Sequence, residues 1–233
     1  MERIDKIIAN QTSYSRRDVK KLVLQKRVEV NGKTINSSDL KIDSNKDTIT
    51  IDGTRVNIKK NIYLVLNKPK GYISATEDKT MPTVLDLVPE EYLHRELFPA
   101  GRLDKDTTGL MTITDDGEFA HNILSPKKHI KKVYTVTLDI PVNEDMVKGF
   151  KDGVILNDGE CKSAIMQITG TNTALVTLTE GRYHQIKRMF GCYGAKVIEL
   201  QRIAMGNLAL PDDLEMGECR ELTDEEMERL LCR

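Results

Sequence analysis

The segment AGRLDKDTTGLMTITDDGEF, from Ala100 to Phe119, joins a polar turn to an apolar strand. Two glycines bound the turn, and Arg102, Asp104 and Asp106 lie between them. An aspartate that is ionised, held still and paired with a cation can act as a nucleophile. A glycine-bounded turn that enters a strand can do the holding. On these residues alone the segment is either a solvated loop or a catalytic loop, and the rest of the chain has to separate the two.

The composition is that of a folded chain. The 233 residues, 39% hydrophobic and 30% charged, suit one large domain or a small domain joined to a medium one. No apolar run approaches the roughly 20 residues of a membrane helix, and the first residues lack the apolar core of a secretory signal. The four cysteines form no CxxC pair, which predicts reduced thiols and a cytoplasmic protein.

The sequence gives no support to a metal or a cofactor. The four histidines lack the spacing of metal ligands, and neither the phosphate-binding nor the dinucleotide-binding glycine motif is present. We therefore predict a protein that uses no metal and no cofactor.

Charge is distributed unevenly along the chain. Residues 1–60 carry a net charge of +6 and residues 61–233 a net charge of −7, which indicates a basic module joined to a different body. In the module we predict a helix, a second helix capped by Ser15, and a hairpin at Asn31-Gly32. The second helix has a basic face that is either solvated or bound to phosphate, and the excess of positive charge favours phosphate. Its cationic residues are Arg16, Arg17, Lys20 and Lys21.

From Ile62 onward, many short strands alternate with few, short helices. Strands are predicted over IYLVLN, GYISAT, GLMTITDD, KVYTVTLDI, AIMQIT, TALVTLT and KVIEL. Helices are predicted over DGEFAHNIL, NEDMVKGF and the stripe that starts at Ile186. This order favours an α+β fold: a small α/β domain over residues 1–58, and a larger domain over residues 59–233 built on a mixed, mainly antiparallel sheet flanked by short helices.

A lysine cluster precedes one of these strands, in SPKKHIKKVYTVTL. A basic patch beside an aromatic residue can hold a phosphate chain and stack a base. Because Tyr134 lies on the apolar face of its strand, a core tyrosine is the alternative. The lysines are Lys127, Lys128, Lys131 and Lys132.

A second group of cations lies in TEGRYHQIKRMFGCYG, near the start of an amphipathic helix and away from its apolar stripe. A solvated basic face is the alternative to a binding site here. Because the surrounding domain is acidic overall, the concentration of cations at this one point favours a binding site. The residues are Arg182, His184, Lys187 and Arg188.

Several segments together resemble a known family. RIDKIIA and SRRDVKKLVLQKRVEVNGKTI resemble the S4-type RNA-binding domain. GRLDKDTTGLMTITDDGEFAH, KKVYTV and EGRYHQIKRMF resemble the RsuA-type branch of the RNA pseudouridine synthases, in which an S4-like domain precedes the catalytic domain. The similarity extends essentially from end to end of the chain.

The resemblance implies isomerisation of a uridine to pseudouridine without a cofactor, by a monomer acting on RNA. GRYHQIKRMF is more similar to the small-subunit members than to the large-subunit members, which implies 16S ribosomal RNA or a small-subunit precursor particle as substrate. Asp104 would be the nucleophile or proton shuttle, Lys187 its cation, and Tyr134 the residue that stacks on the base and assists proton removal. The residues expected to bind RNA are Arg102, Thr107, Lys132, Arg182, His184, Arg188, Arg16, Arg17, Lys20 and Lys21.

Three alternatives remain open at this point. The chain could modify large-subunit ribosomal RNA by the same chemistry, or it could be a non-catalytic S4-type protein of ribosome assembly. The third alternative, a glycoside hydrolase with paired carboxylates, is the least favoured, since the chain has no Trp and only 5% aromatic residues for sugar stacking.

Overall fold

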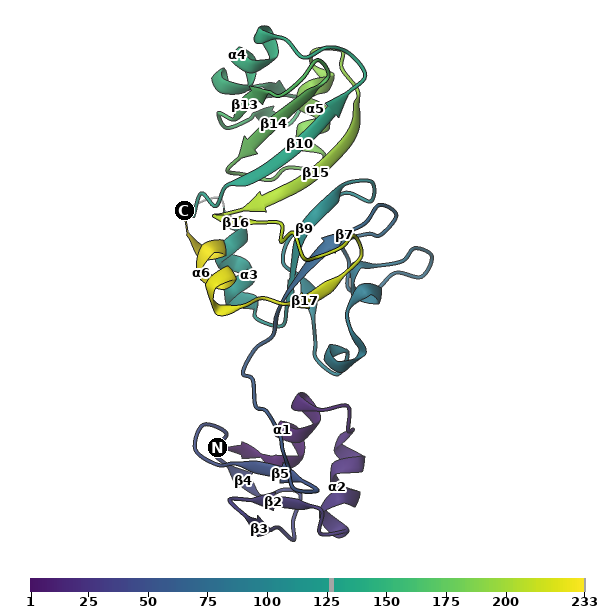
Figure 1. The fold of residues 1–233 in the computed structure, drawn as a ribbon, viewed down its shortest axis with the longest axis vertical. Coiled ribbons are helices and arrows are strands. Elements are labelled where there is room, and N and C mark those ends of the chain that lie inside the picture. The colour runs from purple at the N-terminus through teal and green to yellow at the C-terminus, as the bar shows by residue number, and fades with distance from the viewer. Residues whose placement is uncertain (126–127, 233) are drawn as a thin grey trace. The chain divides into compact units, whose positions relative to one another are not determined.

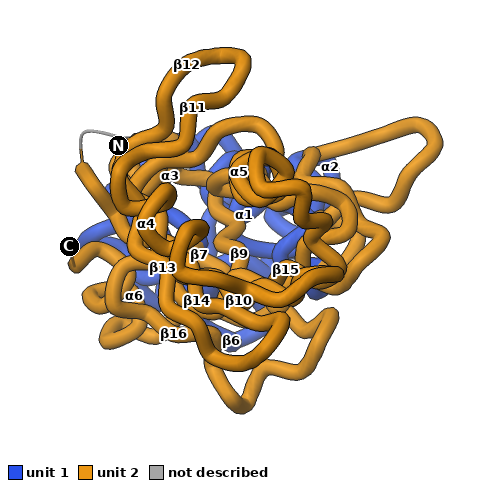
Figure 2. Tube along the Cα trace, turned by 90° about the horizontal axis from the view of Figure 1, so that it is seen from above, with its two compact units in different colours: residues 1–62, 88–97 blue, residues 63–87, 98–233 orange. Residues whose placement is uncertain are grey.

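A computed structural model describes residues 1–125 and 128–232, which form two compact units (Figure 2). The first unit consists of Met1–Ile62 and Val88–Leu97, and the second of Tyr63–Leu87 and Phe98–Arg233. Sequence analysis places the boundary between residues 58 and 59. In the structure the chain passes to the second unit after Ile62 and returns to the first over Val88–Leu97.

The first unit has two helices and short strands around its own core. The helices are α1 (Ile4–Gln11) and α2 (Arg16–Leu24). The strands are β1 (Glu2–Arg3), β2 (Val28–Val30), β3 (Lys33–Thr34), β4 (Lys41–Ile42), β5 (Ile49–Ile51) and β6 (Thr54–Arg55). As predicted, Ser15 caps α2 by accepting from the Asp18 N–H, and β2 and β3 form a hairpin whose turn residues, Asn31 and Gly32, both have positive φ. The strands form two sheets, β1-β4 and β3-β2-β5-β6. The helices and these sheets bury one cluster of aliphatic side chains, from Ile4 to Val56.

The second unit is built on one twisted sheet, drawn in the upper part of Figure 1. Its main strands run in the order β13-β14-β10-β15-β9-β7-β17. They are β7 (Tyr63–Lys68), β9 (Thr108–Thr114), β10 (Lys132–Leu138), β13 (Ile165–Ile168), β14 (Thr173–Leu178), β15 (Val197–Met205) and β17 (Cys219–Glu221). Neighbours are antiparallel except β9 and β15, which are parallel. The predicted α+β class with a mixed, mainly antiparallel sheet is confirmed.

Short elements complete this unit. Its helices are α3 (Gly117–Leu124), α4 (Glu144–Asp152), α5 (Gln185–Gly191) and α6 (Asp224–Leu231), with one 3-10 turn, η1 (Val84–Leu87). A further 3-10 turn, η2 (Glu90–Tyr92), belongs to the first unit. The minor strands are β8 (Phe98–Pro99), β11 (Ile155–Leu156), β12 (Gly159–Glu160) and β16 (Leu208–Ala209). Asp116 caps α3 by accepting from the backbone N–H groups of Glu118 and Phe119.

One predicted strand is wrong. The segment GYISAT forms only an isolated bridge, between Ile73 and Thr83. Its polar groups bond instead to the loop that carries Asp104: the Gly71 N–H donates to the Lys105 carbonyl at 2.8 Å, and Ser74 Oγ donates to the Leu103 carbonyl at 2.7 Å. Because these partners lie about thirty residues further along the chain, local alternation could not distinguish this loop support from a strand.

The parallel pair β9–β15 brings the two halves of the sheet together at a glycine. Gly109 has φ +99°, and a Cβ atom there would lie 2.2 Å from the Arg202 carbonyl oxygen. Only glycine permits this approach of the two backbones. The loop 100–107, which enters β9 at this point, is thereby held beside the β10–β15 half of the sheet.

Candidate active site

Asp104 lies in the loop between β8 and β9 and lines a pocket of about 440 Å³. Its side chain is 25% exposed, so the carboxylate is open to a ligand without being freely solvated. Other segments that line the pocket are the start of β10, the end of β14 and the loop before α5. The strand β10, the helix α5 and the loop 100–107, remote from one another in sequence, therefore meet at one cavity.

The cation predicted for Asp104 is in place. Lys187, on α5, has its Nζ 3.4 Å from Asp104 Oδ2 and 2.5 Å from Asp106 Oδ1. Burial by itself would raise the pKa of Asp106, but the hydrogen bond and charge of Lys187 outweigh it and lower the pKa. Lys187 therefore bridges two carboxylates, and Asp106 shares the cation of Asp104.

His184 faces the other oxygen of the same carboxylate. Its Nε2 lies 3.4 Å from Asp104 Oδ1, and it adds a second positive charge there when protonated. The residue has φ +47°, in the left-handed region that few residues other than glycine adopt. This strained turn immediately precedes α5, so the backbone that starts the helix also aims the imidazole at Asp104.

Lys68, which sequence analysis missed, fixes the backbone of the Asp104 loop. The side chain is fully buried at the end of β7. Its Nζ donates to three carbonyls of the loop, those of Thr107 at 2.9 Å, Asp104 at 3.1 Å and Lys105 at 3.3 Å. A fourth acceptor is the carbonyl of Pro69, the next residue in the chain. Burial lowers the pKa of Lys68 to about 8, against the opposing charges of Asp106 and Asp104. The only signal in the sequence was a lysine at the end of a buried strand, in LVLNK.

Tyr134 and Lys132 lie two residues apart on β10, whose side chains alternate between buried and half-buried. Both are buried and both line the pocket. Tyr134 thus lies on the apolar face of its strand, as predicted, and at the pocket too. Lys132 is buried, whereas Lys128 and Lys131, which sequence analysis grouped with it, are exposed. Lys127 lies outside the described residues.

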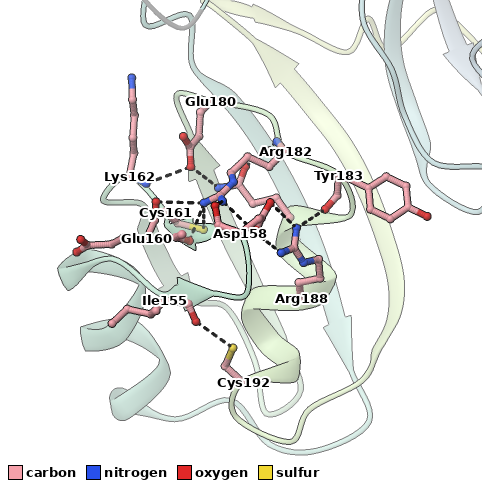
Figure 3. Close-up of polar contacts among 12 residues, drawn as sticks. Ile155, Asp158, Glu160, Cys161, Lys162, Glu180, Arg182, Tyr183, Arg188 and Cys192 are labelled. Atoms are coloured by element: carbon pink, nitrogen blue, oxygen red, sulfur yellow. Dashed lines mark hydrogen bonds and ion pairs between the residues drawn. The ribbon is translucent and has the colours of Figure 1, made fainter.

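Arg182 and Arg188 bond to the protein itself, as Figure 3 shows. Arg182 donates to the Asp158 carbonyl at 2.6 Å and to the Gly159 carbonyl at 2.9 Å, and Arg188 forms an ion pair with the Asp158 carboxylate and donates to the Tyr183 carbonyl at 3.1 Å. The hydrogen bond from Arg188 is the main cause that lowers the pKa of Asp158 to about 2. These guanidinium groups clamp the β11–β12 hairpin to α5 and to the loop before it. Their predicted contact with RNA stays a prediction.

Arg102 and Thr107, which were expected to bind RNA, both line the cavity. Arg102 is exposed, whereas Thr107 is buried and its hydroxyl has no hydrogen-bond partner among the described residues. Tyr183, which sequence analysis passed over, is 71% exposed at the pocket rim with its ring stacked 3.8 Å from the His184 ring. The rim therefore offers a cation and an aromatic face.

The basic residues of α2 belong to the first unit and are all exposed. Arg16 pairs with Asp5 at 3.0 Å and Lys21 with Asp18 at 3.2 Å. Arg17 and Lys20 have no ion pair within the part of the chain that the structure describes. The helix thus keeps part of its positive charge uncompensated.

Comparison with known families decides the class of the catalytic unit. A model of the RNA pseudouridylate synthase family matches residues 62–191, more than half of the chain. The chain belongs to the RNA pseudouridine synthase family. An S4 domain model matches residues 2–49, so the predicted pairing of an S4 domain with a pseudouridine synthase domain is confirmed.

Relatives of this pseudouridine synthase align with it over nearly their whole length. An uncharacterized RNA pseudouridine synthase of Bacillus subtilis, YtzG, is 40% identical over 98% of each chain. The ribosomal small subunit pseudouridine synthase A of Yersinia pestis is 41% identical over 97% of this chain and 96% of its own, and that of Escherichia coli K12 40% identical over 97% and 98%. A crystal structure of a pseudouridylate synthase, 38% identical, superposes with a TM-score of 0.70 over 99% of this chain and 100% of the other.

These findings confirm that the pseudouridine synthase is an enzyme, an RNA-modifying isomerase. The non-catalytic alternative and the glycoside hydrolase alternative are not supported by them. Among the described residues, no helix is long and apolar enough to cross a membrane.

Proposed function

We propose that this pseudouridine synthase isomerises a uridine of small-subunit ribosomal RNA and that Asp104 supplies the reacting carboxylate. The RNA assignment is supported by the full-length similarity to the enzymes of Yersinia pestis and Escherichia coli, whose names specify the small subunit. The site assignment rests on one observation: a partly exposed carboxylate lines a pocket and lies between Lys187 and His184.

The chemistry needs no group that the chain lacks. The C1′–N1 bond of the uridine breaks, the uracil turns, and C5 bonds to C1′; C5 then loses its proton and N1 gains one. Attack on C1′, attack on C6 and removal of a sugar proton are three routes to this product, and each uses a carboxylate that is ionised. In the structure Lys187 Nζ lies 3.4 Å from Asp104 Oδ2, and His184 Nε2 lies 3.4 Å from Asp104 Oδ1.

The uridine has to leave its base stack to reach the carboxylate, which costs a few kcal/mol. Tyr134, buried at the pocket, offers a ring on which the flipped uracil can stack and a hydroxyl that can assist removal of the C5 proton. The exposed lysines before β10, Lys128 and Lys131, and the basic face of α2 supply attraction for phosphates that offsets the cost. The substrate in this proposal is 16S ribosomal RNA or a small-subunit precursor particle, modified by a cytoplasmic monomer.

Asp104→Asn tests the site, with Asp106→Asn as the matched control because it removes the other carboxylate that Lys187 contacts. Each protein is incubated with 16S transcripts, with small-subunit precursor particles and with 23S transcripts, and pseudouridine is mapped at single-nucleotide resolution. Asp104→Asn should lose turnover by about 1000-fold or more, while its affinity for the RNA stays within a few-fold of wild type. Asp106→Asn should keep measurable turnover.

Normal yield from Asp104→Asn would remove this residue from the mechanism. Modification that falls only on 23S ribosomal RNA would support the large-subunit alternative instead. Activity on particles without activity on transcripts would identify the assembling particle as the substrate.

A further inference from the structure

Lys132 is a buried lysine at the start of β10. Its residue is 7% exposed, and its Nζ makes one hydrogen bond, to the Ile130 carbonyl at the long distance of 3.4 Å. No carboxylate of residues 1–125 or 128–232 pairs with it. An ammonium group removed from water without a partner is strongly unfavourable, so a fold that keeps one at a pocket has a use for it there.

The position of Lys132 ties that use to the reacting base. The side chains of Lys132 and Tyr134 project from the same face of β10, and both line the pocket that contains Asp104. A base that stacks on Tyr134 would therefore share one cavity with the Lys132 side chain.

A second buried cation strengthens the positive field at this point. Arg202 lies on β15 opposite Tyr134, is 2% exposed, and has an Nη2 without a hydrogen-bond partner among the described residues. Burial, and then the charge of Arg202, lower the pKa of Lys132 to about 8. The lysine is thus still charged in most molecules at neutral pH. The other titratable groups that line the pocket are Asp104, Glu180, Arg102, Arg182, Tyr183, His184 and Tyr134.

We propose that the Lys132 ammonium donates a hydrogen bond to a carbonyl oxygen of the flipped uracil and stabilises the negative charge that the uracil carries during the reaction. The inference deepens the function proposed above and rests on it. When the C1′–N1 bond breaks, its electron pair stays with the uracil and spreads onto the carbonyl oxygens; attack on C6 places charge on O4 as well. Lys132 keeps its protons throughout, so it acts as an electrostatic stabiliser and not as an acid.

The same contact would select the base. Lysine only donates hydrogen bonds, and uracil offers a carbonyl at C4 where cytosine has an amino group that also donates. If O4 is the oxygen that Lys132 binds, cytidine would place two donors against each other and leave a buried charge unpaired. Rejection of this kind is strong, since it leaves polar groups of the site unsatisfied.

Lys132→Met is the direct test, and Lys131→Met, an exposed lysine one residue earlier, is its matched comparison. On the uridine that wild type modifies, Lys132→Met should slow the single-turnover rate of bound RNA by about 100- to 1000-fold and leave the dissociation constant within about 3-fold. Lys131→Met should do the reverse: the rate of bound RNA stays, affinity weakens, and the slope of log affinity against log salt falls by about 1.

Two further measurements separate a chemical role from a structural one. The thermal midpoint of Lys132→Met should equal or exceed that of wild type, because a buried unpaired charge has been removed. Replacing O2 or O4 of the target uridine by sulfur, a weaker acceptor, should slow wild type at the oxygen that Lys132 binds and slow Lys132→Met much less, as coupled groups do in a double-mutant cycle.

A Lys132→Met rate within about 3-fold of wild type on bound RNA would overturn the inference, and so would a rate loss that neither sulfur substitution reduces. If wild type is active and Asp104→Asn is inactive, either result refutes only the role of Lys132 and leaves the proposed function standing. If wild type modifies an RNA other than the small-subunit one, the RNA assignment fails, and the same comparison is made on the uridine it does modify.

Discussion

Lys68 and Lys132 are both buried lysines of the catalytic unit, and they differ in what surrounds their ammonium groups. Lys68 donates to four backbone carbonyls, whereas Lys132 has one long hydrogen bond. Burial lowers the pKa of both amines to about 8. A buried charge is tolerated where hydrogen bonds replace the lost water. Lys68 is therefore a structural cation, whereas in the inference above the partner of Lys132 arrives with the substrate.

The same criterion sorts the cations around α5. Arg182 and Arg188 are bonded to the β11–β12 hairpin, so they belong with Lys68 (Figure 3). Lys187 is an intermediate case, because its partners are carboxylates of the pocket loop itself. The charge of a side chain thus says little about its role until its partners are known.

The largest expected effect is on stability, in a comparison of Lys68→Met with Lys132→Met. Lys68→Met leaves loop carbonyls without their donor, which should destabilise the catalytic unit by about 3 kcal/mol, and turnover should fall because Asp104 is no longer held. Lys132→Met should cost no stability. Urea unfolding, followed on the transition of the catalytic unit, measures both changes.

If Lys132→Met destabilised the protein as much as Lys68→Met, the distinction between a satisfied and an unsatisfied lysine would be lost. Lys131→Met serves as the control for removal of a positive charge, since its side chain is exposed.

A smaller effect is expected in the pH dependence of stability. Below about pH 8 the Lys132 amine is charged in both the folded and the unfolded state, and the folded state bears the full cost of burying it. Between pH 8 and the unfolded value of 10.5 the folded protein has released the proton and the unfolded chain has not, so this lysine makes stability rise with pH. The rise has an upper bound on the order of 3 kcal/mol.

Lys132→Met should lose that part of the alkaline rise, while the part due to Lys68 remains. Unfolding free energies of the two proteins at pH 7 and at pH 10 provide the measurement. A difference between them that does not shrink with pH would mean that Lys132 is not destabilised by burial.

Local signals in the sequence predicted the Ser15 cap and the hairpin at Asn31-Gly32, because these residues act on neighbours within three positions. For Asp104, Tyr134 and Lys187 the local patterns left a solvated loop, a core tyrosine and a solvated basic face open. The resemblance of their segments to the family singled these three residues out, and their catalytic roles stay predictions.

What the sequence could not supply are partners that come from remote segments. In the sequence Lys68 is only a lysine at the end of a strand, because the carbonyls to which it donates lie more than thirty residues further along the chain. The sequence does not show that Arg182 and Arg188 bond to Asp158, because that residue lies 24 and 30 residues upstream of them. Sequence analysis grouped Lys132 with the neighbouring exposed lysines. The alternation of β10 places Lys132 on the same face as Tyr134, but it does not show that a pocket lies at that face.

The smallest effect is expected at Asp158, where the clamp can be loosened without touching the pocket. Asp158→Asn removes the ion pairs to Arg182 and Arg188, but the backbone acceptors of Arg182 remain. Turnover should fall by less than about 10-fold, because the turn that aims His184 is displaced only slightly, and RNA affinity should hold or rise as the guanidinium groups are released. Glu160→Gln is the control, since it changes the charge of the same hairpin by the same amount without removing an acceptor of either arginine. Should Asp158→Asn instead bind RNA much more tightly and Glu160→Gln not, the two arginines would belong with Lys132, as cations that await the substrate.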